Sequence, residues 1–154
     1  MSRTLVAFAA ALTAALVVTV AAFGSGSGGH GGHGKTFTVV EHPNTDATTD
    51  TGASGDSAGD ILTFANDVFD AKDAKKVASD QGSCVRTVPG QSYECAWTTI
   101  LSDGQITVEG PFYDTKDSRL AITGGTGRYR NARGTMDLVA RENGKFGFVF
   151  HVIG

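Results

Sequence analysis

Short segments in which apolar and polar residues alternate fill this sequence from residue 35 to its end. Period-2 alternation bounded by Gly, Pro, Asp and Asn is typical of half-buried β-strands, and no segment after residue 35 shows the 3.6-residue period of a helix. We place strands at 36–42, 60–69, 76–88, 91–102, 104–112, 117–124, 133–142 and 145–153. The chain therefore has to bury its apolar residues with strands alone.

Eight antiparallel strands with short links favour a closed up-and-down β-barrel. Closure leaves no sheet edge exposed, and no helix is predicted that could cover a sheet face. The links "SDG" and "ENG" are typical of tight hairpin turns. A β-sandwich is the alternative. We therefore predict an all-β domain over residues 35–154, with an interior wide enough for side chains or one small ligand.

The residues before this domain differ from it in composition. Residues 1–23 carry a single charge, Arg3, and an Ala/Val/Leu run that ends in small residues, which predicts a signal peptide and a secreted protein. The run approaches the length of about 20 residues that spans a bilayer, so a retained membrane anchor is the alternative. Residues 24–34, "GSGSGGHGGHG", are predicted to form a flexible linker, because two histidines on a glycine coil make a poor metal site.

The charge balance and the motifs narrow the choice of partner. The chain has 16 acidic and 13 basic side chains, a formal net charge of −3, which argues against a nucleic-acid partner. No metal-ligating cluster and no catalytic triad stands out in the sequence of the domain. We therefore expect neither a metal nor another cofactor.

Cys84 and Cys95 are the only cysteines of the chain. The midpoint of "CVRTVPGQSYEC" falls between Pro89 and Gly90, a turn signal, and a hairpin folded there places the two cysteines opposite each other. Two cysteines in a secreted domain favour a disulfide over a reactive thiol. We therefore predict a bond between Cys84 and Cys95.

Two polar residues interrupt the apolar face of the predicted strands. Glu41 alternates in phase with Phe37 and Val39, and Asn66 alternates in phase with Phe64. A carboxylate and a carboxamide among apolar side chains are costly unless they are hydrogen-bonded, which makes them candidates for a functional site. The alternative is that both lie at the mouth of the barrel, hydrated and without function.

The segment "ITGGTGRYRNARG" has the glycine density of a phosphate-binding loop. A Walker loop needs Lys-Ser or Lys-Thr after its last glycine and a helix thereafter, whereas here Arg128 and Tyr129 follow in an all-β context. We therefore interpret Gly124, Gly125 and Gly127 as structural positions at a corner of the barrel. The arginines of this corner are expected to form a solvated face rather than an anion-attracting rim.

Longer motifs carry a resemblance to known families. The segment "EGPFYDTKDSRLAITGGTG" (109–127) resembles a stretch of plant allene oxide cyclases, and "GGTGRYRNARG" (124–134) is similar to the glycine-rich corner of dirigent proteins. The segment "GDILTFANDVF" (59–69) also resembles a cyclase strand. The resemblance covers about residues 36–154 and implies an eight-stranded barrel that forms a homotrimer.

The resemblance also implies roles for three residues. Glu41 matches a cyclase glutamate that helps delocalise charge as an epoxide opens, Asn66 matches an asparagine that helps to hold a water, and Cys84 matches a pocket cysteine. We expect a cofactor-free barrel that binds a small apolar oxygenated or polyene molecule and isomerises or cyclises it, with Glu41 and Asn66 as its catalytic residues. The ligand would contact Phe64, Cys84, Tyr93, Trp97 and Phe148. A non-catalytic barrel that binds an apolar ligand, or is purely structural, is the alternative.

We predict that export removes the N-terminal segment close to Ala22, where small residues form a plausible cleavage site. The mature chain then begins at or just before the glycine-rich linker. Mass spectrometry of the intact secreted protein measures this directly. A product that still carries residues 1–23 would contradict a cleaved signal peptide.

Overall fold

The computed structural model of the protein describes residues 34–154. The predicted signal peptide, and all of the predicted linker except Gly34, lie outside the described residues. Within residues 34–154, the only helical element is one turn of 3-10 helix at Glu142–Gly144, and no helix there is long and apolar enough to cross a membrane. The described part of the chain is thus built from β-strands.

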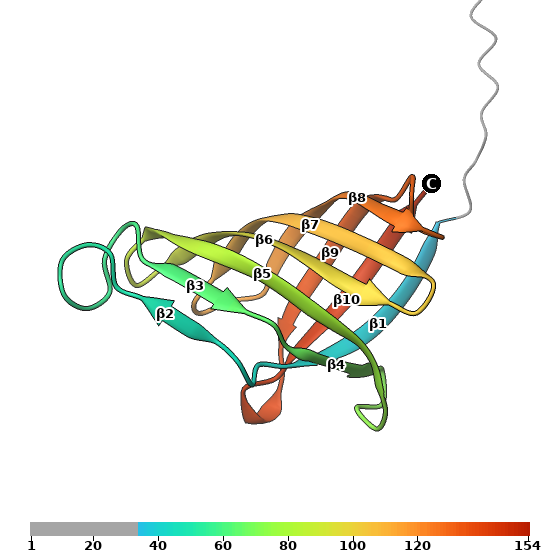
Figure 1. The fold of residues 1–154 in the computed structure, drawn as a ribbon, viewed down its shortest axis with the longest axis horizontal. Coiled ribbons are helices and arrows are strands. Elements are labelled where there is room, and N and C mark those ends of the chain that lie inside the picture. The colour runs from blue at the N-terminus through green and yellow to red at the C-terminus, as the bar shows by residue number, and fades with distance from the viewer. Residues whose placement is uncertain (1–33) are drawn as a thin grey trace, which may run out of the picture. The chain divides into compact units, whose positions relative to one another are not determined.

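The strands form one closed antiparallel barrel (Figure 1). They are β1 (Lys35–His42), β2 (Ala47–Thr49), β3 (Ile61–Phe64), β4 (Asp67–Asp70), β5 (Lys76–Val88), β6 (Ser92–Leu101), β7 (Gly104–Tyr113), β8 (Ser118–Gly127), β9 (Arg133–Ala140) and β10 (Phe146–Ile153). Strand β1 pairs with β4 on one side and with β10 on the other, which closes the ring. The predicted eight-stranded barrel is confirmed, and this closure excludes the two-sheet sandwich.

Ten strands make an eight-stranded barrel because three of them are short. Strands β3 and β4 lie one after the other along β5, in place of the single strand predicted at 60–69. They are separated at Ala65 and Asn66, although the main chain of Asn66 still exchanges two hydrogen bonds with that of Asp80 on β5. Strand β2 was not predicted. It lies in the segment between the first two predicted strands, which we expected to be a loop, and it pairs with β3.

The apolar core fills the end of the barrel where β1 begins and β10 ends. Phe37 on β1 stacks on Phe150 on β10, with ring centroids 5.0 Å apart. The side chains that are most completely buried around them include Val39, Ile106, Leu120, Met136 and Phe148. This packing closes one end of the barrel to a ligand, and the candidate site lies toward the other.

The glycine-rich corner between β8 and β9 depends on two of its glycines. Gly127 has a φ of +56°, a conformation that side chains rarely adopt. A Cβ on Gly125 would lie 2.4 Å from the carbonyl oxygen of Gln105 and 2.5 Å from that of Tyr129. A Cβ on Gly124 would meet nothing closer than the Arg133 side chain, at 3.9 Å. The chain can therefore turn this tightly only because Gly125 and Gly127 lack side chains.

Gly125→Ala is expected to lower the free energy of unfolding by about 2 kcal/mol, because the added methyl group is forced against main-chain oxygens that cannot move independently. Gly124→Ala is the matched control and should change the stability by less than about 0.5 kcal/mol. Urea denaturation of both variants measures the difference. Equal effects of the two substitutions would contradict the close approach at Gly125.

Candidate functional site

A cavity of about 280 Å³ opens inside the barrel, toward the end where β1 stops and β10 starts. Its walls are formed by Leu62, Phe64, Cys84, Tyr93, Cys95, Trp97, Phe112, Leu138, Phe146 and Phe148, and its acidic members are Glu41 and Asp46. All five side chains predicted to contact a ligand belong to this set, and so does the predicted catalytic Glu41. The other predicted catalytic residue, Asn66, lies behind the wall.

Aromatic rings enclose most of the cavity. Trp97 packs against Phe148 at 5.5 Å between ring centroids and meets Phe64 edge-on at 6.1 Å. Phe112 meets Phe146 edge-on at 5.8 Å, next to the loops of the open end. The volume lies near the lower end of the range of about 300 to 1,000 Å³ that is common for ligand pockets. The cavity therefore suits a small, flat, apolar molecule.

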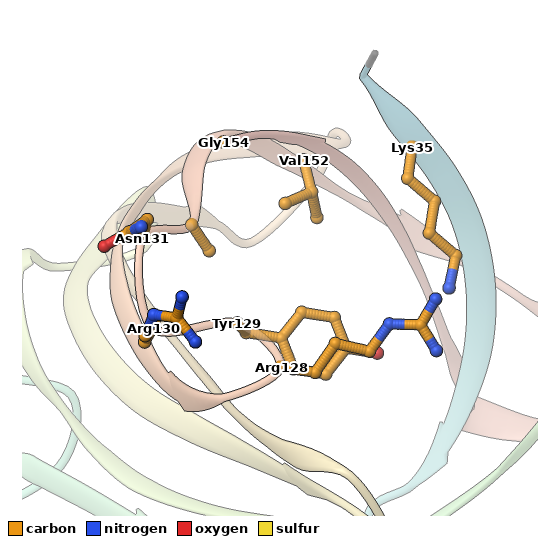
Figure 2. A pocket seen from close by; sticks show the side chains of 8 residues that line it. Lys35, Arg128, Tyr129, Arg130, Asn131, Val152 and Gly154 are labelled. Atoms are coloured by element: carbon orange, nitrogen blue, oxygen red, sulfur yellow. The ribbon is translucent and has the colours of Figure 1, made fainter. Parts of the chain in front are cut away.

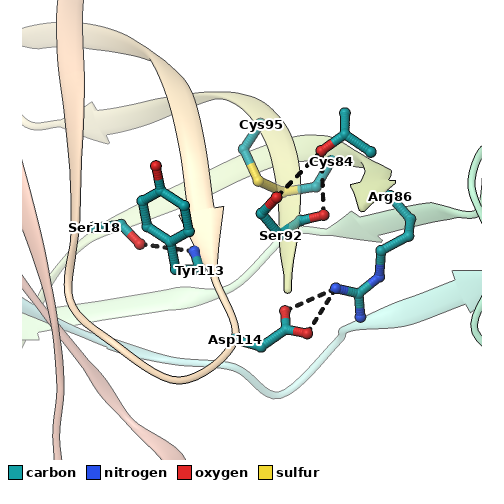
Figure 3. The surroundings of a disulfide bond; sticks show 8 residues. Cys84, Arg86, Ser92, Cys95, Tyr113, Asp114 and Ser118 are labelled. Atoms are coloured by element: carbon teal, nitrogen blue, oxygen red, sulfur yellow. Dashed lines mark hydrogen bonds and ion pairs between the residues drawn. A yellow bond between two sulfur atoms is a disulfide. The ribbon is translucent and has the colours of Figure 1, made fainter. Parts of the chain in front are cut away.

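The predicted disulfide is confirmed. Cys84 on β5 and Cys95 on β6 are paired across the two strands and joined by a bond between their sulfurs (Figure 3). Both residues are buried in the wall of the cavity, and no free cysteine occurs in the sequence or in the described residues. Cys84 thus presents a disulfide to a ligand, and not a thiol.

A buried arginine fixes the rim of the cavity. Arg86 lies over the ring of Tyr93, with the guanidinium carbon 3.7 Å from the ring centroid. It donates to both carboxylate oxygens of Asp114 at 2.8 Å (Figure 3), and its Nε forms an ion pair with Asp56 at 2.6 Å. The arginine thereby ties the loop before β3 and the loop after β7 to the wall. Sequence reasoning missed it, although Arg86 shares the phase of Cys84 on the same strand.

Asn66 is the hydrogen-bonding centre of the site. Its side-chain nitrogen donates to Glu41 Oε1 at 2.9 Å and to Asp46 Oδ1 at 2.7 Å. Its side-chain oxygen accepts from the main-chain nitrogens of Asn44 and Thr45, at 3.1 and 2.9 Å, and from the Thr45 hydroxyl at 3.0 Å. Both hydrogens of the amide are therefore in use. Asn66 orients Glu41 and ties the segment after β1 to the break between β3 and β4.

A second buried carboxyl group, Asp80, adjoins Glu41. Its Oδ1 accepts from the main-chain nitrogen of Asn66 at 3.3 Å, and its buried Oδ2 has no donor among the described residues. Sequence reasoning missed Asp80, although it lies four residues before Cys84 and therefore on the same face of β5. Glu41, Asn66 and Asp80 thus form one buried cluster.

Burial and the neighbouring charge of Glu41 raise the pKa of Asp80 to about 9. Burial also raises the pKa of Glu41, and the hydrogen bond from Asn66 opposes this. Two carboxyl groups in contact inside a protein cannot both ionise readily. The raised pKa of Asp80 means that this group keeps its proton near neutral pH, and a side-chain hydrogen bond joins it to Glu41.

No group of three or more His, Cys, Asp or Glu side chains is arranged to hold a metal ion in the part of the chain that the structure describes. The acidic cluster at Asn66 is instead held together by an amide and a shared proton. Two carboxylates of this cluster line the cavity, Glu41, which is buried, and Asp46, which is exposed, so Glu41 is the stronger candidate for any chemistry.

The chain belongs to the family of allene oxide cyclase barrel-like domains, whose family model matches residues 39–146. The resemblance read from the sequence motifs is thereby confirmed. Among solved structures, a pyocyanin demethylase shares 28% sequence identity with a TM-score of 0.65, over 75% of this chain and 100% of that one.

Two more distant structures share the fold. The pterocarpan synthase dirigent protein PsPTS1 is 18% identical with a TM-score of 0.59, over 79% of this chain and 97% of that one. The exo-specific intermolecular Diels-Alderase AbnU is 14% identical with a TM-score of 0.63, over 80% of this chain and 100% of that one. At these identities the likeness establishes the barrel alone.

We predict that the raised pKa of Asp80 makes the protein less stable as the pH rises. Above about pH 4 the unfolded state loses the Asp80 proton, whereas the folded state keeps it until about pH 9, so stability falls across this window and levels off above it. Asp80→Asn keeps a donor toward Glu41 but cannot ionise. Urea denaturation measures the free energy of unfolding at each pH. Between about pH 5 and pH 8 this free energy should fall by at least about 2 kcal/mol more in the wild type than in the variant.

Asp117→Asn, which removes an exposed carboxylate, is the matched control and should follow the wild-type pH profile. If the wild type and Asp80→Asn have parallel pH profiles, Asp80 is ionised in the folded protein at neutral pH and the shared proton does not exist.

Proposed function

We propose that this protein binds a small, flat, mostly apolar molecule in the barrel cavity and that Glu41 acts on it without a cofactor. The observation that carries this proposal is the buried carboxylate of Glu41 in an aromatic wall around about 280 Å³, whereas the other acidic lining residue, Asp46, is exposed. Glu41 is only 6% exposed, which is a costly position for a charge unless it is hydrogen-bonded as it is here. A merely structural barrel would be expected to fill this space with apolar side chains.

The proposed chemistry is isomerisation or cyclisation through a positively charged or proton-losing transition state. A carboxylate in a site that excludes water interacts strongly with positive charge that develops beside it. The hydrogen bonds from Asn66 and Asp80 hold Glu41 in place before the ligand arrives, so no reorganisation is needed during the reaction. Trp97, Phe64 and Phe148 would hold the ligand in a reactive shape. Asn66 acts in this scheme as a positioning residue.

The ligand class is inferred from the walls and from one relative. Aromatic rings in edge-on and offset arrangements favour a flat conjugated ligand. The oxygenated and polyene molecules expected from the sequence include ligands of this kind. The similarity to pyocyanin demethylase extends this class to planar nitrogen heteroaromatics. Pyocyanin is therefore the first compound to test, as a probe of the cavity.

Secretion is part of the proposal. The apolar N-terminal sequence supports it, and the disulfide between Cys84 and Cys95 is of a kind that persists mainly in oxidising compartments. A protein in that setting meets its ligand outside the cytoplasm, where a reaction that needs no soluble cofactor has an advantage.

A carrier without catalysis is the second candidate. It is favoured by the hydrogen bonds of Asn66, which leave this side chain with no free donor for a ligand or a water. Glu41 is then the one buried carboxylate that faces the cavity, and its charge could serve only to bind a cationic or proton-donating ligand.

We predict that Glu41→Gln abolishes turnover while ligand binding survives. Trp97 is the only tryptophan and lines the cavity, so quenching of its fluorescence by pyocyanin reports occupancy directly. Turnover of a conjugated oxygenated or polyene substrate, followed by its absorbance, should fall at least about 100-fold, because loss of one electrostatic group costs that much in comparable sites. The dissociation constant should change by less than about threefold, because Gln keeps the shape of the side chain.

Glu94→Gln, on the exposed face of β6, is the matched control and should match the wild type in both assays. Quenching without turnover in the wild type would support the carrier. Turnover that survives Glu41→Gln would contradict the catalytic role, and failure of both pyocyanin and the conjugated substrate to quench Trp97 would contradict ligand binding in this cavity.

A further inference from the structure

A second hollow lies at the closed end of the barrel. It has a volume of about 360 Å³ and is lined by Lys35, Arg128, Tyr129, Arg130, Asn131, Ala132, Val152 and Gly154 (Figure 2). We call these residues the basic bowl. Lys35 and Glu41 stand at opposite ends of β1, and Val152 and Phe146 stand near opposite ends of β10. The basic bowl is therefore separate from the ligand cavity.

The floor of the basic bowl is rigid. Tyr129 is 7% exposed, and its ring packs at 6.2 Å between centroids from Phe37, which stacks on Phe150 in the core. The glycine-rich corner that carries Arg128 and Arg130 is locked by the close main-chain approach at Gly125. The main chain that carries these two arginines is thus held in position, while their side chains are exposed.

The side chains of the basic bowl carry three positive charges, and the main-chain carboxylate of Gly154 adds one negative charge, so positive charge is in excess. Arg128 forms an ion pair with Asp103, which is not in the lining, at 3.2 Å. Within residues 34–154, no carboxylate side chain lies within 4.0 Å of the charged atoms of Lys35 or Arg130. Figure 2 shows Arg128 directed toward Lys35, and Arg130 directed into the hollow. Like charges that converge on a concave surface favour a bound anion.

We propose that the basic bowl binds a phosphate group, carried either by a free phosphate ester or by a lipid headgroup. Guanidinium groups match the spacing of phosphate oxygens and donate two hydrogen bonds at once, while the lysine adds a mobile point charge. Three cations around one hollow suit an anion with oxygens in several directions, as a phosphate monoester or diester has, better than a planar carboxylate. The corner thus attracts an anion although it lacks the helix and lysine of a nucleotide loop.

The test is a titration of the whole protein with inorganic phosphate at constant ionic strength, followed through its main-chain amide NMR signals. Chloride at the same ionic strength is the reference. Saturable shifts are expected at residues 128–132 and at Lys35, and not at the cavity residues Glu41 and Trp97. Arg130→Gln, which breaks no ion pair, should weaken binding about fivefold, the loss expected for one cation near a phosphate.

Arg119→Gln is the matched control, because Arg119 is an exposed arginine on the outer wall, paired with Asp137, and its loss changes the net charge equally. It should leave phosphate affinity unchanged. A second arm measures sedimentation with vesicles of phosphatidylcholine, with and without phosphatidylglycerol. Vesicle binding that needs phosphatidylglycerol and falls in Arg130→Gln identifies a headgroup as the source; shifts with free phosphate alone identify a soluble ester.

The proposal is overturned if neither phosphate nor phosphatidylglycerol vesicles bind, or if Arg130→Gln and Arg119→Gln weaken binding equally, since the effect is then one of net charge. None of these outcomes depends on the ligand cavity. Failure here leaves the proposed function untouched, and loss of turnover in Glu41→Gln leaves the basic bowl untouched.

Discussion

A carboxylate inside an apolar barrel has to be hydrogen-bonded, and the hydrogen bond from Asn66 to Glu41 meets this requirement. The same amide also holds Asp46 and the main chain after β1, so one side chain fixes both the charge and the wall beside it. Asp80 completes the arrangement with a shared proton. The buried carboxylate of the cavity and the rigidity of the wall beside it follow from satisfying this cluster.

The barrel supplies the conditions under which such a cluster can act. The pairings of β1 with β4 and β10 and of β5 with β6 close the ring, and the packed rings of Phe37 and Phe150 fill one end of it. The disulfide and Arg86 stiffen the wall and rim at the other end. The strand that pairs with β5 is interrupted at Ala65 and Asn66, and this is where the polar cluster enters the wall.

The sequence predicted the features that depend on local alternation. Strand phase placed Glu41 and the apolar walls inside, and the turn at Pro89 and Gly90 placed Cys84 opposite Cys95. Asp80 and Arg86 were within reach of the same reasoning, because both share the phase of Cys84. Strand β2, and the contact of Asp46 with Asn66, could not be predicted, since they depend on how a loop without alternation folds back on distant residues. The basic bowl could not be predicted either, because Lys35 and the arginines at 128 and 130 lie more than 90 residues apart in the sequence.

The central claim is that Glu41 and Asp80 share one proton beside the cavity. Carbon-13 NMR of the carboxyl groups, recorded against pH, measures the charge of each group separately. The account predicts that one of the two carboxyl groups stays protonated well above about pH 7, in line with the raised pKa of Asp80. Ionisation of both groups below about pH 5 would mean two independent, hydrated carboxylates, and would contradict the account.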